Sequence, residues 1–350
     1  MNVRRLIPTA ATAGAVTLGL LALSACSTSD AAGVDGDGRL KVSASFYPMQ
    51  YLAEQIGGAN VSVTPLTKPG VEPHDLELKP RQTAELNDSG LILYLKGVQP
   101  AVDKAIEQSG VKYKVDAATL TQLEHFDTAG GHDHGHEEGH EGESEAEHEE
   151  HAAEGEAGHE EHAAEGEAGH EEHQDEAGAD PHIWLDPVKY AEVAKGVGAQ
   201  MEKADPDHAA DYRKNTDALV AKLTALHTDF EQGLKNSSTK TFITTHSAFG
   251  YLAERYGLEQ EGIAGVDPES EPSPARIKEL QGIAKKDKVT TVFFETLASD
   301  KTARTLASDT GLRTDVLDPL EGITDRSKGD DYIEVMRSNL AALQKALGAK

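Results

Sequence analysis

The chain has 350 residues, a formal net charge of −28 and a single cysteine. The acidic balance argues against a nucleic-acid-binding protein, which needs a basic face. One cysteine excludes intramolecular disulfides and zinc sites built from several cysteines. Residues 127–180 hold 21 of the 61 acidic residues and no Lys or Arg. The remainder, with 40 acidic and 33 basic residues, has the charge of an ordinary soluble surface.

Residues 1–25 have the pattern of a signal peptide, because the basic start MNVRR precedes an apolar run too short for a permanent membrane span. The run ends in LSAC at residues 23–26, which resembles the cleavage box of bacterial lipoproteins and implies lipidation of Cys26. The alternative is an ordinary secretory signal with its cysteine just past the cleavage site. Residues 26–38 are expected to form a flexible tether. No later apolar run reaches the roughly 18 residues of a membrane helix.

Strands and helices alternate from residue 39 onward. The pattern predicts strands at 39–46, 60–67 and 91–97, helices at 47–58 and 81–90, and a loop at 68–80. Such alternation is typical of an α/β lobe with a mostly parallel sheet, which we assign to residues 39–205.

Residues 127–180 interrupt this alternation. The sequence HEEHAAEGEAG occurs at 148–158 and again at 159–169. Each copy carries two glycines and no large apolar residue that would hold a helix against a core. We therefore predict a disordered, exposed insertion within the first lobe.

One stretch of the insertion matches the H-E-x-x-H pattern of zinc metalloproteases, between His136 and His140. That site needs a stable helix, and Gly135 and Gly139 interrupt it, so the match is expected by chance and no enzyme is predicted. The insertion is predicted to collect zinc weakly, the alternative being a solvated spacer without a metal role. Its ten histidines are the accessory ligands in this interpretation: His132, His134, His136, His140, His148, His151, His159, His162, His170 and His173.

The second half repeats the α/β pattern after one long helix. Asp205 followed by Pro206 predicts a helix start, and residues 206–236 then run about 45 Å without a strong breaker. We interpret this helix as a bridge between two lobes. The second lobe is expected over residues 237–350, with strands at 240–246 and 289–295 and a strand that runs into a loop at 313–322. Its helices are expected at 247–257, 272–287, 299–311 and 331–347.

Three histidines outside the insertion stand out, and two of them, one in each lobe, lie where α/β proteins bind ligands. His74 lies in a loop after a strand, His246 ends a strand, and His182 lies in a loop before a helix. Ligands of open α/β sheets bind beyond the carboxyl ends of the strands. The pattern therefore places imidazoles on both sides of a cleft between the lobes. The other three have no such signal and are interpreted as loop or solvated helix residues: His125, His208 and His227.

Candidate acidic partners follow the last two strands: Glu295, Asp318 and Glu321. Three histidines and one carboxylate form a tetrahedral ligand set that suits Zn²⁺. Mg²⁺ and Ca²⁺ prefer oxygen ligands alone, and Mn²⁺ prefers more carboxylates than this set offers.

Four motifs together resemble the solute-binding lipoproteins of ABC transporters for zinc and manganese (cluster A-I), and most closely the high-affinity zinc-uptake members. The motifs are EPHDLELKP, DPHIWLDP, THSAFGYLAERYGL and LDPLEG, and the resemblance covers residues 39–350. It implies two α/β lobes bridged by one long rigid helix, with the metal in the interlobe cleft. It also implies His74, His182 and His246 as ligands.

The fourth ligand of the family is a carboxylate in the loop after the last strand, and Glu321 fits it best. Asp318 and Glu295 are the alternatives, and Glu295 has a second interpretation as the residue that orients a ligand histidine.

The resemblance further implies a monomer that captures Zn²⁺ outside the cytoplasm and delivers it to an ABC transporter permease. A lipid on Cys26 would hold it at the outer face of the bacterial cytoplasmic membrane. The alternatives are a manganese-specific protein of the same fold, and a surface adhesin or zinc-storage lipoprotein. The long helix predicts small motions on binding. Because binding needs neutral imidazoles, affinity is expected to fall below about pH 6.

Overall fold

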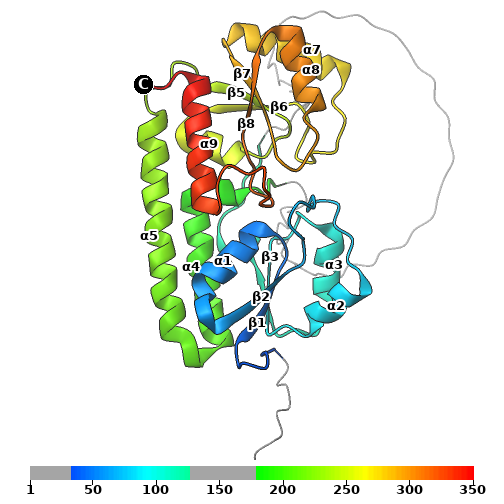
Figure 1. Cartoon of the computed structure of the whole chain (residues 1–350), viewed down its shortest axis with the longest axis vertical. Coiled ribbons are helices and arrows are strands. Elements are labelled where there is room, and N and C mark those ends of the chain that lie inside the picture. The colour runs from blue at the N-terminus through cyan, green and yellow to red at the C-terminus, as the bar shows by residue number, and fades with distance from the viewer. Residues whose placement is uncertain (1–32, 127–178) are drawn as a thin grey trace, which may run out of the picture.

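The computed structural model describes residues 33–126 and 179–350 (Figure 1). The predicted signal peptide with Cys26, residues 26–32 of the tether, and residues 127–178 of the insertion, which include its ten histidines, lie outside the described residues. Among those that are described, no helix is both long and apolar enough to cross a membrane.

The N-terminal lobe contains the predicted parallel sheet, with four strands in the order β2-β1-β3-β4. Its strands are β1 (Leu40–Ala44), β2 (Val61–Pro65), β3 (Leu91–Tyr94) and β4 (Tyr113–Asp116). Its helices are α1 (Tyr47–Gly57), α2 (Pro80–Asn87) and α3 (Pro100–Gln108). The sequence pattern had not indicated α3 or β4.

The C-terminal lobe repeats this arrangement, with the parallel order β6-β5-β7-β8. Its strands are β5 (Thr241–Thr244), β6 (Glu259–Gly262), β7 (Thr291–Phe294) and β8 (Arg313–Val316). Its helices are α6 (Gly250–Tyr256), α7 (Pro274–Lys286), α8 (Lys301–Thr310) and α9 (Tyr332–Leu347). The prediction missed β6, and the stretch 313–322, expected to be a strand that runs into a loop, is a strand as far as Val316.

Alternating side chains place each sheet between two hydrophobic layers. In β3, Leu91 and Leu93 belong to the central core, whereas Ile92 between them packs with residues of α2 and α3. In β7, Phe293 faces the central core and Val292 packs with residues of α7 and α8. Because all five side chains are buried, these strands read as continuous apolar runs, as parallel strands covered on both faces do.

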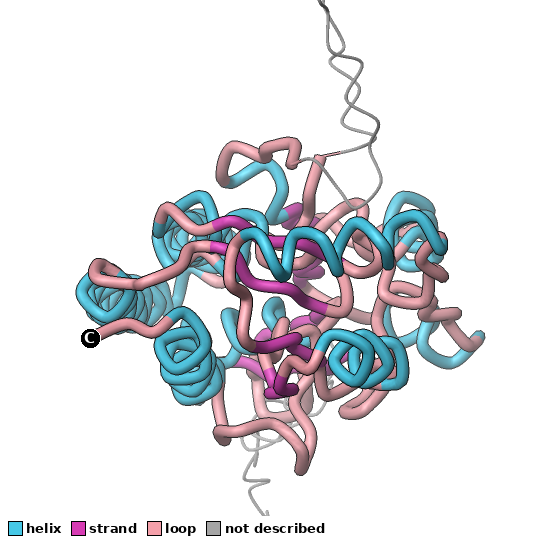
Figure 2. The backbone as a smooth tube through the Cα atoms, turned by 90° about the horizontal axis from the view of Figure 1, so that it is seen from above, coloured by secondary structure: helices cyan, strands magenta, loops and turns pink. Residues whose placement is uncertain are grey.

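Two long helices run along one side of both lobes (Figure 1): α4 (Pro187–Ala204) and α5 (Ala209–Leu234). Viewed from above, the strands lie in the middle of the molecule and helices surround them (Figure 2). Leu223 and Phe230 of α5 are fully buried in one continuous core that includes side chains from both sheets. This shared core is the structural reason to expect small motions between the lobes.

The helix predicted at 206–236 begins later than the sequence indicated. A 3₁₀ turn at Pro206–His208 precedes α5, and the side chain of Asp205 makes no capping hydrogen bond. Its Oδ2 instead lies 2.8 Å from Nδ1 of His208 and accepts a 2.6 Å hydrogen bond from the Tyr212 hydroxyl. The carboxylate that was expected to cap the helix therefore ties the turn to the first turn of α5.

Candidate metal centre

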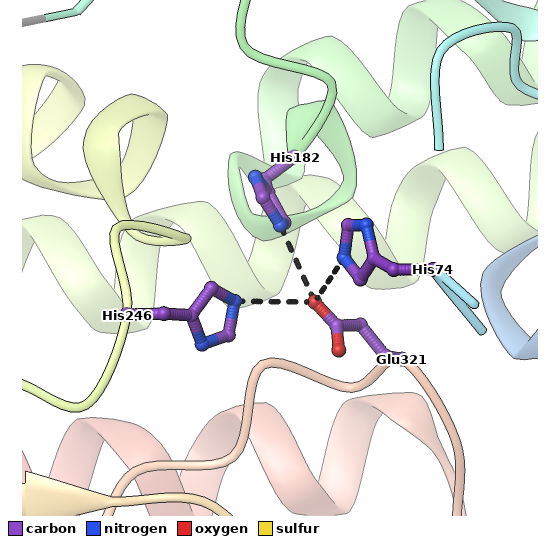
Figure 3. Close-up of side chains that lie close together, drawn as sticks. All are labelled: His74, His182, His246 and Glu321. Atoms are coloured by element: carbon purple, nitrogen blue, oxygen red, sulfur yellow. Dashed lines mark hydrogen bonds and ion pairs between the residues drawn. The ribbon is translucent and has the colours of Figure 1, made fainter. Parts of the chain in front are cut away.

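Four side chains from four separate segments meet between the lobes: His74, His182, His246 and Glu321 (Figure 3). One possible ligand atom from each lies within 4.8 Å of the others. Oε1 of Glu321 lies 3.3 Å from Nε2 of each of the three histidines. Glu321, His182 and His246 are buried, and the His74 side chain is 11% exposed. The fold thus brings together the four residues preferred from the sequence.

The spacing of these atoms fits a tetrahedral zinc ion. Zinc binds imidazole nitrogen and carboxylate oxygen at about 2.0–2.1 Å, and a tetrahedron with such bonds has edges of about 3.3–3.4 Å. The three distances from Glu321 to the histidines have this length. Nε2 of His246 is buried without a hydrogen-bond partner, as expected for an atom that faces a cation.

His74 lies in the loop between β2 and α2. The residue that precedes helix α3 holds this loop in place. Its backbone N–H donates to Oε1 of Glu72 at 3.1 Å. The carbonyl of Pro73 accepts from the side-chain amide of Gln99 at 3.1 Å, and the same amide donates to Thr67 at 2.9 Å. Gln99 immediately precedes α3, so this helix fixes the loop beside the cluster.

His182 is oriented by Asp180, two residues earlier. One oxygen of this buried carboxylate lies 2.7 Å from Nδ1 of His182 and accepts from its backbone N–H at 2.8 Å. Asp180 thereby leaves Nε2 of the ring free to face Glu321. The prediction of a disordered, exposed insertion over 127–180 was wrong for Asp180, which is buried and bonded to His182. The D-x-H spacing in DPHIW is the signal that indicates this role.

His246 follows β5 and is oriented by Glu295, which follows the adjacent strand β7. Nδ1 of His246 lies 2.9 Å from Oε1 of Glu295, which also accepts from the Thr245 hydroxyl at 2.6 Å. Glu295 therefore stands behind the ring rather than in the cluster. This geometry matches the second interpretation of Glu295, as an orienting residue.

Asp318, the other alternative, shapes the loop that carries Glu321. It accepts hydrogen bonds from the Leu320 backbone at 2.9 Å, the Ser327 hydroxyl at 2.9 Å and the Thr296 hydroxyl at 3.1 Å. Leu320 has a positive φ of 60°. The turn around Asp318 thus directs Glu321 into the cluster, and Asp318 itself is not among the four clustered residues.

The remaining histidines of the described chain also lie outside the cluster. His208 bonds to Asp205 before α5. His227 packs against the ring of Tyr256, with ring centroids 5.8 Å apart. It is therefore partly buried, contrary to the solvated position predicted for it.

Two effects act in opposite directions on the pKa values of the two buried histidines. Burial lowers these pKa values, and the neighbouring carboxylates raise them. Burial lowers the pKa of His182, but Asp180 and Glu321 outweigh it and raise the pKa to about 8. Against the same effect of burial, Glu295 and Glu321 raise the pKa of His246 well above its ordinary value. Burial would raise the pKa of Glu321, yet its three histidine contacts hold the pKa well below the usual range. A cation entering the site must therefore displace protons.

Glu72 is a further carboxyl beside the site that the sequence analysis did not single out. Burial and the nearby Glu321 raise its pKa to about 8. Its Oε2 is buried without a hydrogen-bond partner.

Comparison with known proteins decides the family. Residues 42–346 match the sequence model described as "Zinc-uptake complex component A periplasmic". The chain belongs to this zinc-uptake component A family. Its similarity to the high-affinity zinc uptake system protein ZnuA of Bacillus subtilis covers nearly all of both proteins, with 37% identity over 339 residues, 94% of this chain and 95% of that one.

Other members of the zinc-uptake component A family are longer. The chain is 33% identical over 332 residues to the zinc-binding lipoprotein AdcA of Streptococcus pneumoniae, and the match covers 93% of this chain but 58% of AdcA. The Zn(II)-bound ZnuA-like domain of pneumococcal AdcA superposes with a TM-score of 0.66, 28% identity, and coverage of 89% and 99%. The laminin-binding protein Lmb of Streptococcus agalactiae superposes with a TM-score of 0.69, 27% identity, and coverage of 88% and 99%.

Proposed function

We propose that this chain is the extracytoplasmic zinc-binding component of an ABC transporter, which captures Zn²⁺ and delivers it to a membrane permease. The observation that carries the proposal is the buried cluster in which Glu321 lies 3.3 Å from three imidazole nitrogens. His74, His182, His246 and Glu321 are the proposed zinc ligands. Family membership supports the assignment, as do relatives named for zinc uptake and zinc binding.

Four protein ligands favour binding over catalysis. Catalytic zinc sites keep a position open for water or substrate, whereas a site closed by four side chains holds the ion. We therefore propose that zinc is cargo and that the chain is not an enzyme. Asp180 and Glu295 would orient His182 and His246, which strengthens these rings as ligands.

The other parts of the chain have proposed roles around this site. A lipid on Cys26 would hold a monomer at the outer face of the cytoplasmic membrane, with residues 26–38 as the connection. The flexible part of this tether would end before Gly33, which already pairs with Ser89 of the N-terminal lobe. The lobes at 39–205 and 237–350, joined by the helix region 206–236, would enclose the ion. The histidines of the insertion would collect zinc weakly near the cleft.

Calorimetric titration of Zn²⁺ and Mn²⁺ into the soluble chain that follows Cys26 tests the metal. We expect one tight zinc site and weaker manganese binding. A preference for manganese would overturn the choice of metal and leave the fold untouched.

Two matched changes test where the tight site lies. Replacing His74 and His182 by Ala should abolish tight stoichiometric binding, because it removes two of the four proposed ligands. Deleting residues 132–173 should remove only weaker, multiple sites. Loss of the tight site in the deletion alone would refute the assignment of the four ligands.

Surface adhesion is a second candidate function, favoured by the similarity to Lmb, which is described as "a bifunctional protein with adhesin and metal transporting activity". Binding of the soluble chain to immobilised laminin, with and without zinc, tests it. No binding above that of an unrelated acidic protein would remove this candidate.

A further inference from the structure

The segment 180–186, which carries the candidate ligand His182, is held at both ends by helix α6 of the C-terminal lobe. The hydroxyl of Tyr251 donates to the carbonyl of Asp180 at 2.7 Å. Four residues later on α6, the guanidinium of Arg255 contacts Oδ2 of Asp186 through Nε at 2.8 Å and Nη2 at 2.6 Å. Residues four apart share one face of a helix, so a single face of α6 holds both ends of the segment.

The Tyr251 hydroxyl makes a second contact that closes the stem of the insertion. It accepts from the backbone N–H of Glu124 at 2.8 Å, while the backbone N–H of Asp180 donates to the carbonyl of Glu124 at 2.9 Å. The ring of Tyr251 is 1% exposed, packs edge-on against Phe126 at 4.8 Å and lies beneath the ammonium of Lys189 at 5.2 Å. Packing on several sides thus fixes where this hydroxyl lies.

The position of Asp180 bears directly on the metal centre. Its carboxylate bonds to both the ring and the backbone of His182, so a shift of Asp180 moves the imidazole. Helix α6 begins at Gly250, four residues after His246, which is another of the candidate ligands. The helix therefore links the segment that carries His182 to the loop that carries His246.

We propose that Tyr251 is a positioning residue of the zinc site, which sets His182 relative to His246 by fixing Asp180, with Arg255 fixing the other end of the segment. The inference rests on the proposed zinc-binding function. A hydroxyl that only stabilised the fold would affect unfolding and leave zinc affinity unchanged, so the two roles differ in a measurable quantity.

The test is the zinc dissociation constant of the mature chain, measured by competition with a chromophoric chelator. Tyr251→Phe keeps the ring and removes both hydrogen bonds. Loss of a residue that bonds directly to a metal ligand typically weakens metal affinity by 10–100-fold. Because Tyr251 acts on His182 only through Asp180, we expect a smaller loss of zinc affinity, about fivefold. The matched control is Tyr212→Phe, which removes a buried hydroxyl bonded to Asp205, and its affinity should stay within twofold of wild type.

A double-mutant cycle tests the route through Asp180. If Tyr251 acts through this residue, Tyr251→Phe should weaken binding by less than twofold when Asp180 is already Ala. An equal fivefold effect in both backgrounds would overturn the route. Unchanged affinity in Tyr251→Phe, with or without a lower melting temperature, would overturn the proposal.

Arg255→Gln provides a second variant, because this side chain is 34% exposed and its loss leaves the core intact. It should weaken zinc binding by about threefold, and Arg255→Lys should restore part of the affinity. Wild-type affinity in Arg255→Gln would remove Arg255 from the proposal. Failure of the wild-type chain to bind zinc tightly would instead refute the proposed function, so the two failures are distinguishable.

Discussion

Zinc affinity should depend on pH far more steeply than ordinary imidazoles would allow. Zinc needs the neutral form of each ligand histidine. The pKa of His182 is raised to about 8, so between pH 8 and pH 6 its protonation alone should weaken zinc binding about 50-fold. The pKa of His246 is also raised well above its ordinary value, by Glu295 and Glu321, so its protonation weakens zinc binding in the same direction. A single histidine with an ordinary pKa near 6.5 would give only about fourfold over the same range.

Calorimetry in buffers of different ionisation enthalpy measures how many protons the histidines release when zinc binds. At pH 7, His182 alone should release about 0.9 proton per zinc and His246 should add to this number, whereas a single ordinary imidazole would release about a quarter of a proton. The His182→Ala variant, if it still binds zinc measurably, should release about one proton fewer. Release of fewer than one proton by the wild-type chain would refute the reasoning, because the carboxylates would then not hold these rings protonated.

The remaining predictions concern zinc affinity and stability. Glu295→Ala should weaken zinc binding 10–100-fold by releasing the His246 ring, while the surface change Glu279→Ala should leave the same competition titration unchanged. Metal-free protein should lose about 2 kcal/mol of unfolding free energy as pH rises through 8. The folded-state pKa of His182 lies above the unfolded value, so its stabilisation is full below pH 6.5 and lost above pH 8; a flat urea-unfolding profile from pH 7 to 9 would contradict this. Leu223→Ala should cost about 2–5 kcal/mol in urea unfolding, and separate unfolding of the two lobes would argue against their shared core.

The two-lobed fold could be predicted because buried parallel strands are continuous apolar runs between helices. The strand β3, with Leu91, Ile92 and Leu93 all buried, is such a run. The strand β6 could not be recognised, since its sequence EQEG is polar and Glu259 at its start is exposed. Its place at the sheet edge depends on pairing with β5 rather than on its own pattern.

The candidate ligands could be named because histidines beyond strand ends carry a positional signal, and because their motifs resemble a known family. Their orienting partners were harder to find. Asp180 lies two residues before His182, so the two side chains can meet. Whether the carboxylate reaches Nδ1 or Nε2 of the ring depends on the side-chain rotamers, and these are set by packing in the folded protein. The start of α5 was misplaced for a similar reason, since Tyr212 competes for the carboxylate of Asp205 that the sequence assigned to a cap.

The hydrogen bond between Asp180 and Glu124 has a consequence for how this protein can evolve. These residues flank the long histidine-rich run, and they already meet at 2.9 Å. A connection that closes on such a pair costs only about 0.6 kcal/mol more when its length doubles. Copies of the eleven-residue repeat can therefore be gained or lost by unequal recombination while the path of the chain into the metal centre stays the same.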